Sequence, residues 1–445
     1  MDHHVKQTPV QGVTGLWGGV QGALASAISS IPADFDFASV VNGLEDSSGV
    51  QKAEKPVVAA DPHNEDRWAI GFTDDDGNSS KRFWIRIATR SGTSLTLSDA
   101  FDASDTSASS PAMCFCTDAA GKILIAYNGS GIDARVISFS GSAGSESFTR
   151  GTKVDLSNYG LGIEPGGGLV PLNDTGRYLL AFKHSSAAYI RILTVSGTTI
   201  TFDSAGGSDA ISLSENTSCI PMVAMDPDDD TAGMMCLVNS SEDFVVRPLT
   251  FSGSGTSANV SVGSQQKLTA GTNDGGGYIN NEGWQSLMTS GSGKYIAFAR
   301  GGDSPHNNKL VGVAFDYDGS SFTIGSAHYA PENHKSASNN QFNKWVGGNN
   351  GGNKCALVGR MSVNQGSPSS RIFYAIIATR NDDRTIDYTD ADALGNDGTG
   401  NTGLYDFFTA TQSDDAQTTF SIWNDNTGGV GYSNLAGRLW QLGSE

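Results

Sequence analysis

The sequence predicts an all-β fold, specifically a seven-bladed β-propeller with four-stranded blades. A turn leading into an apolar strand recurs along the chain, most clearly in residues 117–127, 173–182 and 289–298. With looser copies included, successive turn positions are 55 to 63 residues apart, at Asp66, Gly121, Gly176, Ala232, Gly293, Asn353 and Ala416. A period in this range indicates repeated supersecondary units, and four strands per unit is typical of propeller blades.

Composition supports a repeat array of strands and excludes some partners. A single array can absorb 445 residues without a second core. The 56 glycines and the low charged fraction of 17% suit many tight turns and polar loops. The net charge of −19 would repel a phosphate backbone, so we expect no nucleic-acid partner.

Each unit contains four strand-like runs, which in the first unit are residues 57–60, 68–72, 83–89 and 94–97. The second and third runs are richest in large apolar residues, as expected of middle strands covered on both faces. The third run passes to the fourth through a Gly-containing turn, because Gly supplies the positive φ of such turns. The first run should line the axis, with inner-strand residues Val57, Met113, Leu169, Val223, Leu287, Val346 and Phe408.

The ends of the repeat region predict how the ring closes. The last unit has runs at 407–411, 418–423 and 437–442 but no fourth run, whereas residues 34–41 resemble an isolated fourth strand. We therefore expect residues 35–40 to pair beside residues 438–442, which also removes two exposed edges. This divides the chain into an arm, residues 1–33, and a propeller, residues 34–445.

The arm is predicted to attach the ring to another protein. Its apolar residues fall at helical spacing, but four nearby glycines weaken a helix, so it should order only when docked. The predicted anchoring residues are Leu16, Trp17, Val20, Leu24 and Ile28. A tail without consequence is the alternative.

Long connections in the last three units should emerge on one face, which we call the loop face. Gly, Asn and Ser with occasional aromatic rings suit contact with sugars or protein surfaces. The predicted binding residues are Tyr278, Trp284, His306, Tyr405, Trp423 and Tyr432. The alternative is that these rings only pin the loops to the blades.

The sequence offers little for catalysis, metals or cofactors. The five cysteines are interpreted as buried apolar residues, and the seven histidines show no metal-ligand spacing. Acidic loops at 74–77, 226–230 and 387–392 leave calcium binding open, although none has full calcium-loop spacing. No nucleophile, phosphate-loop or dinucleotide motif is present, so we expect neither an enzyme nor a cofactor.

The N-terminus lacks a signal-peptide pattern, and no apolar run approaches the length of a membrane span. The sequence is therefore expected to be a soluble chain made in a cytoplasm, with no membrane insertion.

The succession of apolar strand, Asp-x-x-x-Gly-Lys, apolar strand and Val-Ser-Gly-Thr-x-Ile-Thr-Phe resembles repeat propeller proteins of tailed, especially marine, bacteriophages. The resemblance covers roughly residues 55–445 and implies a virion structural protein: a tail fibre or other exposed appendage assembled in the host cytoplasm. It implies other virion proteins as partners, a host-surface glycan or protein as contact, and homo-oligomerisation as an option. The alternatives are a secreted or periplasmic carbohydrate-binding propeller, or a glycan-cleaving propeller enzyme.

Overall fold

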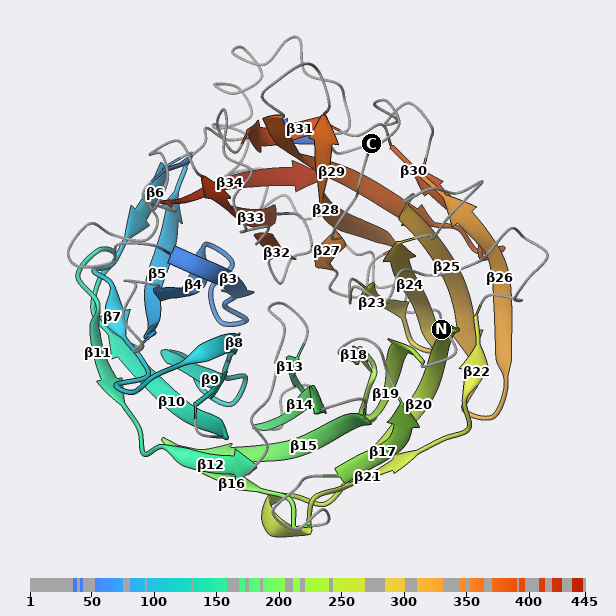
Figure 1. The fold of residues 1–445 in the computed structure, drawn as a ribbon, viewed down its shortest axis with the longest axis horizontal. Helices are drawn as coiled ribbons and strands as arrows, with labels where there is room; N and C mark the ends of the chain where they lie inside the picture. The colour runs from blue at the N-terminus through green and yellow to red at the C-terminus, as the bar shows by residue number, and fades with distance from the viewer. Residues whose placement is uncertain are drawn as a thin grey trace, which may run out of the picture.

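The computed structural model describes residues 35–37, 41–42, 53–74, 81–92, 94–129, 131–157, 168–172, 176–184, 187–204, 211–216, 221–239, 243–268, 285–300, 310–330, 345–348, 353–363, 370–389, 392–396, 408–412, 418–425 and 434–442. The chain is an all-β propeller, as predicted, with its sheets arranged around a common centre (Figure 1).

The described strands form seven antiparallel sheets, numbered here in chain order. Sheet 1 contains β3 (Ala53–Ala60), β4 (Arg67–Asp74), β5 (Phe83–Ser91), β6 (Ser94–Leu97) and β7 (Phe101–Asp102). Sheet 2 contains β8 (Ser109–Phe115), β9 (Lys122–Asn128), β10 (Ile132–Ser140), β11 (Ser147–Arg150) and β12 (Val154–Ser157). Sheet 3 contains β13 (Leu169–Pro171), β14 (Arg177–His184), β15 (Ala187–Ser196), β16 (Thr199–Phe202) and β17 (Ile211–Asn216).

The next two sheets follow the same order. Sheet 4 contains β18 (Met222–Asp226), β19 (Asp229–Val238), β20 (Phe244–Ser252), β21 (Asn259–Val262) and β22 (Gln266–Lys267), with the 3-10 turn η3 (Gly255–Ser257) before β21. Sheet 5 contains β23 (Gln285–Gly291), β24 (Lys294–Arg300), β25 (Leu310–Tyr317) and β26 (Phe322–Tyr329).

The last two sheets complete the arrangement. Sheet 6 contains β27 (Trp345–Gly348), β28 (Lys354–Val363), β29 (Ser370–Arg380), β30 (Ile386–Tyr388) and β31 (Asp392–Asn396). Sheet 7 contains β32 (Phe408–Gln412), β33 (Thr418–Asp425) and β34 (Asn434–Leu442), joined by β1 (Phe35–Phe37) and β2 (Val41–Asn42).

The first strand of each sheet lies nearest the centre (Figure 1). Each of these inner strands contacts the inner strands of the two neighbouring sheets, and β32 contacts β3. All seven residues predicted for inner strands lie in them, in β3, β8, β13, β18, β23, β27 and β32. The first apolar run recurs at the same place in each repeat, so the sequence repeat was sufficient to identify the inner strands.

The middle strands are buried on both faces. In β9, Ile123 to Tyr127 are all buried, so the strand is a continuous apolar run instead of an alternating one. Neighbouring sheets cover both faces, and one core cluster joins residues of sheets 1 and 2, including Ile85 and Ile125. The packed sheets thus hold the inner strands and their ends in place.

The predicted hairpin turns between first and second strands are present. Gly121, Gly176 and Gly293 have φ angles of 73°, 64° and 65°. At Gly121 a Cβ atom would stand 2.8 Å from the Phe139 carbonyl oxygen, and the Phe139 N–H donates to the Gly121 carbonyl oxygen over 2.8 Å. Glycine is therefore required both by the left-handed conformation and by the close approach.

The prediction of four-stranded blades was wrong in detail. Among the described strands, six sheets have five strands each and sheet 5 has four. In the six, two short outer strands pair with the same neighbouring strand, as β6 and β7 both pair with β5. Between them Ser98 leaves the strand and its hydroxyl accepts the Ile87 N–H, so a side chain replaces one ladder bond. Short interrupted edge strands also resist edge-to-edge pairing with other chains.

The N-terminal segment completes sheet 7 at its outer edge, as predicted. Phe35 pairs with Leu442 and Phe37 with Trp440, and Val41 pairs with Gly437 further along β34. In sheets 1–4 and 6 both parts of the outer strand come from one local stretch of chain, whereas in sheet 7 they are supplied by the opposite end of the chain.

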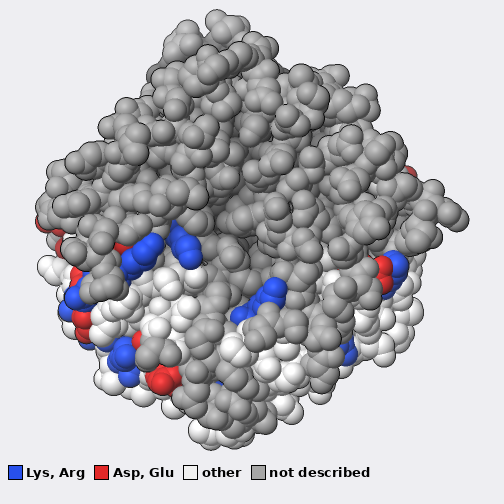
Figure 2. Space-filling model, in the orientation of Figure 1, with Lys and Arg blue, Asp and Glu red and all other residues white. Residues whose placement is uncertain are grey.

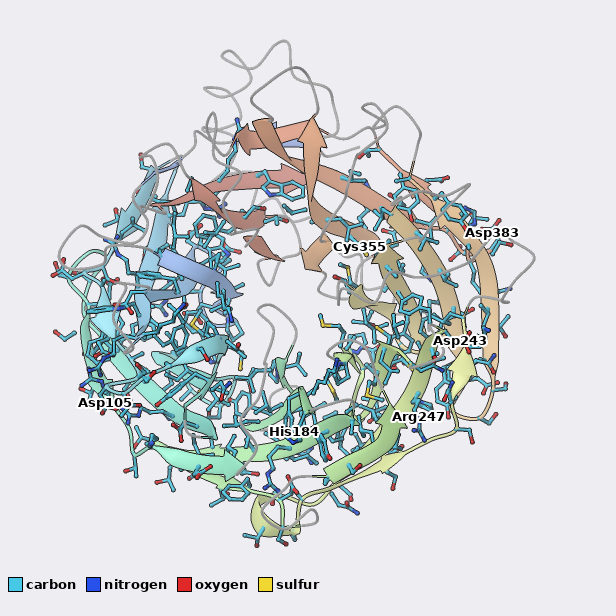
Figure 3. The ribbon with its side chains drawn as sticks, viewed as in Figure 1. Asp105, His184, Asp243, Arg247, Cys355 and Asp383 are labelled. Carbon is cyan, nitrogen blue, oxygen red and sulfur yellow. The ribbon has the colours of Figure 1, made fainter. Side chains whose placement is uncertain are left out.

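A repeated arginine on the third strand ties adjacent sheets together. Arg135 forms a bidentate ion pair with Asp105, which follows sheet 1 in the chain. Arg191 donates to the Leu156 carbonyl oxygen of sheet 2, and Arg247 to the Leu213 carbonyl oxygen of sheet 3. Arg86 and Arg438 occupy the corresponding positions of β5 and β34. Figure 3 shows Arg247 on β20 and Asp105 at the periphery of the ring.

Candidate functional site

The structure places few of the residues predicted to bind or anchor. Tyr278, Trp284, His306, Tyr405 and Tyr432 lie outside the described residues, as do Leu16, Trp17, Val20, Leu24 and Ile28. Trp423 lies in β33, where it pairs with Phe408 and Ala436, so its backbone belongs to a middle strand next to a loop. Both sets of residues remain predictions.

A different candidate site lies where β3 and β8 begin, at their loop-face ends. Both strands carry a bulge there, between Glu54 and Val57 in β3 and between Ser109 and Ala112 in β8. Within these bulges Lys55 has a φ of 45° and Ser110 a φ of 48°, the left-handed region that non-glycine residues rarely adopt. Strained backbone of this kind costs about 1–3 kcal/mol per residue and concentrates at functional sites.

The two bulges bring a lysine and a serine together across the sheet 1–sheet 2 boundary. Lys55 Nζ donates to Ser110 Oγ over 3.1 Å. Ser110 is only 7% exposed and Lys55 is half-buried. A proline follows each of them, Pro56 and Pro111, and this X-Pro pair one repeat apart is the signal in the sequence that marks the two positions.

A buried polar cluster lies beside this pair, between the second and third strands of sheet 2. Asp133 is 1% exposed, and its Oδ2 accepts from Lys153 Nζ over 3.2 Å. Its Oδ1 and the Oδ1 of Asn128 are buried without a hydrogen-bond partner among the described residues. Gly129 makes room for the carboxylate, since a Cβ there would stand 2.3 Å from Asp133 Oδ2. Buried oxygens of this kind are usually satisfied by an ordered water molecule.

Burial and neighbouring charges shift the pKa values of two residues around this cluster. Burial raises the pKa of Tyr127 to about 12, against the opposing effect of the nearby Arg135 guanidinium. Burial alone would raise the pKa of Asp105, but hydrogen bonding and the charge of Arg135 outweigh it and lower that pKa. Tyr127 therefore stays protonated and Asp105 ionised at neutral pH, which suits structural hydrogen bonding rather than proton transfer.

The opposite face, formed by the hairpin turns, is cross-linked between sheets. The Tyr178 hydroxyl accepts from Thr117 N over 2.9 Å and contacts Asp118 Oδ1 at 3.4 Å. Burial raises the pKa of Tyr178, so it remains a neutral hydrogen-bonding group. Asp226, which belongs to one of the acidic loops, accepts from Gly293 N over 2.7 Å in the next sheet. The Asp226 carboxylate thus forms a hydrogen bond between sheets 4 and 5.

The remaining sequence expectations concern cysteines, metals and charge. Cys114, Cys116, Cys236 and Cys355 are buried, as predicted, while Cys219 lies outside the described residues. Within the described ranges no three His, Cys, Asp or Glu side chains are grouped as a metal site. Nor does any helix in those ranges have the length and hydropathy to span a membrane. Figure 2 shows described basic and acidic side chains interspersed on one face.

Glycine at the strained bulge positions should give more stable variants than alanine. Either residue removes the hydrogen bond between Lys55 and Ser110, so the comparison isolates the backbone. At a left-handed position alanine costs about 1–2 kcal/mol relative to glycine, which exceeds the entropic cost of glycine, about 0.5–1 kcal/mol. Urea unfolding should therefore show a higher midpoint for Lys55→Gly than for Lys55→Ala, and for Ser110→Gly than for Ser110→Ala. Ser109 is the matched control, because it does not have a positive φ, and there the glycine variant should have the lower midpoint. Lower midpoints for glycine than for alanine at both bulges would contradict backbone strain.

Comparison with known proteins supports the fold. The sequence matches no protein-family model and no curated protein. Among solved structures, the chain is similar to the BP39L lectin of Burkholderia pseudomallei, with a TM-score of 0.50 and 11% identity over 89% of this chain and 97% of the lectin. A β-propeller domain from Myceliophteria thermophila has a TM-score of 0.47 and 8% identity over 92% of this chain and 99% of that one. A 6-phosphogluconolactonase described as putative, from Bacteroides uniformis, has a TM-score of 0.45 and 12% identity over 85% and 95%. At these identities the likeness shows the fold alone: the chain is a β-propeller.

Proposed function

We propose that this chain is a structural protein of a tailed-bacteriophage virion, a tail fibre or another exposed appendage. Residues 1–33 attach it to a neighbouring virion protein, and the propeller displays its loop face to the host surface or to another protein. It acts by binding and holding, without catalysis. The assignment to a bacteriophage virion is motivated by the resemblance of the repeat motifs to phage propeller proteins.

The proposal treats the seven sheets as seven blades of one closed ring. Contacts between successive inner strands, including β32 with β3, favour this interpretation. A closed ring leaves no sheet edge that needs residues 1–33 for its completion.

The observation that carries the proposal is the position of β1. Phe35 pairs with Leu442 at the outer edge of sheet 7, so residues 1–33 precede a strand on the rim of the ring. An arm that starts from the rim can reach a partner without disturbing the axis or the loop face. Apolar side chains that are fully covered by a partner would contribute about 1.5–3 kcal/mol each, enough for stable attachment.

Deletion of residues 1–33 tests the attachment. The shortened chain retains β1 and β2, so it should fold with an unchanged melting temperature but fail to join particles when co-expressed with the other virion proteins. A matched variant keeps the arm and replaces Leu16, Trp17, Val20, Leu24 and Ile28 with serine, and it should also fail to join. Normal incorporation of both variants, measured by quantifying the chain in purified particles, would refute the anchoring role.

A carbohydrate-binding propeller outside a virion is the second candidate. The observation that favours it is the similarity of the fold to the BP39L lectin, at a TM-score of 0.50. The two candidates make different predictions: only the first requires that residues 1–33 bind another virion protein.

A further inference from the structure

We propose that the outer edge of sheet 5, formed by β26, pairs with the same strand of a second copy of this chain. The β26 strand lies at the rim of the ring, and it is the strand of sheet 5 farthest from the centre (Figure 1). It pairs with β25 and with no other strand in the described part of the chain. Such a dimer goes beyond the proposed function, because it needs no virion component.

The length of β26 distinguishes this edge from the outer edges of the other six sheets. Among the described strands, those six edges are split into two parts of two to six residues each, whereas β26 has eight residues. The β26 strand also continues through a bulge, where its register to β25 shifts between Val313 and Phe315. An unbroken edge strand is a template for pairing with another chain, and most native sheets shorten or interrupt such edges. Sheet 5 therefore presents the edge best suited to adding a strand.

The hydrogen bonds of β25 show which residues of β26 direct their backbone groups outward. The Tyr317 N–H donates to the Gly293 carbonyl oxygen, so the odd-numbered residues of β25 face β24. The Ala330 N–H donates to the Leu310 carbonyl oxygen, so the even-numbered residues of β25 face β26. The residues of β26 that stand opposite the odd-numbered ones therefore have backbone groups directed away from β25: Phe322, Ile324, Ala327 and Tyr329.

These outward residues make β26 complementary to itself. In an antiparallel pair with a two-fold axis at the bulge, Ile324 stands opposite Ala327 of the second copy, and Phe322 stands opposite Tyr329. Each of these residues directs its backbone toward the other strand, as an antiparallel ladder requires. A two-fold contact of this kind closes on itself, so it gives a dimer and not a fibre.

The side chains of the same four residues favour the pairing. All four are aliphatic or aromatic, and they are partly buried against a core cluster that includes Val313 and Phe315. In the dimer they would lie on one face of a continuous sheet, where Phe322 and Tyr329 of the second copy form an aromatic cross-strand pair. The exposed residues of β26, Thr323 and Ser326, are small and uncharged.

Charge and strand length identify the occupant of this edge as a second copy. Residues 319–331 contain no Lys, Arg, Asp or Glu, although the chain has a net charge of −19. Two copies can therefore meet at this edge without placing like charges directly opposite each other. A strand that pairs along the whole of β26 must match it in length, and within the described part of the chain β26 is the outer strand with eight residues.

The test is sedimentation equilibrium of the full chain over a series of concentrations. We expect a reversible dimer with twice the 46.4 kDa mass of one chain. Ala327→Pro removes an outward N–H group without breaking the ladder to β25. It should raise the dimer Kd by about tenfold or more, because the two-fold axis repeats the lost hydrogen bond in both copies.

The matched control is Val262→Pro in the short outer strand β21. The Gly263 N–H donates to the Pro248 carbonyl oxygen, so the neighbouring Val262 also directs its backbone groups outward. This variant makes the same backbone change on a different sheet and should leave the dimer Kd unchanged within about twofold.

Ser326→Lys is a second variant, which remains informative if the melting curve of Ala327→Pro shows a loss of fold. Ser326 is exposed, and the substitution places two lysines beside the two-fold axis, where like charges should weaken the dimer. A monomer at every concentration overturns the proposal and leaves this edge to a strand from another protein. A dimer Kd that neither variant changes also overturns it, because that dimer must form elsewhere. Because the measurement needs no virion component, its failure leaves the test of residues 1–33 unaffected.

Discussion

Deletion of residues 1–42 should lower the melting temperature by roughly 5 °C, because it removes β1 and β2 from the outer edge of sheet 7. Those strands pair with β34 from Leu442 to Ala436. Each ladder hydrogen bond contributes about 1 kcal/mol net, so the loss amounts to several kcal/mol. A change of that size corresponds to a shift of this order in a chain of several hundred residues.

The control for this deletion is the chain that lacks only residues 1–33. It keeps β1 and β2, so its melting temperature should equal that of the full chain. The contrast separates ring closure from any general effect of an N-terminal truncation. If both deletions melt at the temperature of the full chain, β1 and β2 do not stabilise the ring, and the closure argument fails.

The fold could be predicted because its signals are repeated. A buried middle strand needs apolar residues on both faces, and a tight hairpin needs glycine at a left-handed position, so every copy repeats the same pattern. Gly121, Gly176 and Gly293 carry that pattern in the sequence and adopt the expected φ in the structure. Closure could be inferred from one missing strand and one unassigned strand.

The finer features depend on contacts that periodicity does not encode. The split of the outer strand depends on side chains such as Ser98, which accepts a backbone hydrogen bond, and a serine in a polar stretch gives no such signal. The inter-sheet arginines were visible in principle, since Arg86, Arg135, Arg191, Arg247 and Arg438 recur at one position of the third strand. Arg135, Arg191 and Arg247 have partners in or after the preceding sheet, a carboxylate and two backbone carbonyls, which only the folded ring brings near.

The candidate site was also hidden in the sequence. Lys55 and Ser110 stand 55 residues apart, one repeat, and each precedes a proline. A residue before proline is normally extended, so the sequence predicts an ordinary strand entry there. The sequence instead predicts binding by aromatic residues of the long loops. Those residues lie outside the described part of the chain, apart from the backbone of Trp423.

Substitution of Arg191 by methionine should cost about 3–5 kcal/mol of unfolding free energy, the usual result of removing one partner of a buried ion pair. Arg191 and Asp203 are both 0% exposed, and their side chains meet at 3.4 Å. Arg191 also donates to the Leu156 carbonyl oxygen of sheet 2, over 2.7 and 3.0 Å. The variant leaves that carbonyl without its donor and the Asp203 carboxylate buried without its countercharge.

Asp203→Asn should be destabilising too, because it removes the charge of the Asp203 carboxylate from beside the buried Arg191 guanidinium. Its amide can still accept the Ile192 N–H bond that Asp203 Oδ2 now accepts over 2.8 Å, so the cost should be smaller than that of Arg191→Met. The double variant should lose less unfolding free energy than the two single variants together, since it removes both charges of the buried pair.

Urea unfolding of the four chains gives the coupling energy of the pair directly. Arg150→Met is the matched control, because the Arg150 side chain is 34% exposed on the outer strand β11. An exposed pair contributes at most about 1 kcal/mol, so this variant should unfold close to the unsubstituted chain. The opposite result is that the Arg191 and Asp203 variants each lose as little unfolding free energy as Arg150→Met, with losses that add in the double variant. That result would mean that Arg191 does not hold sheets 2 and 3 together. The recurrence of Arg at this position would then need an explanation outside ring stability.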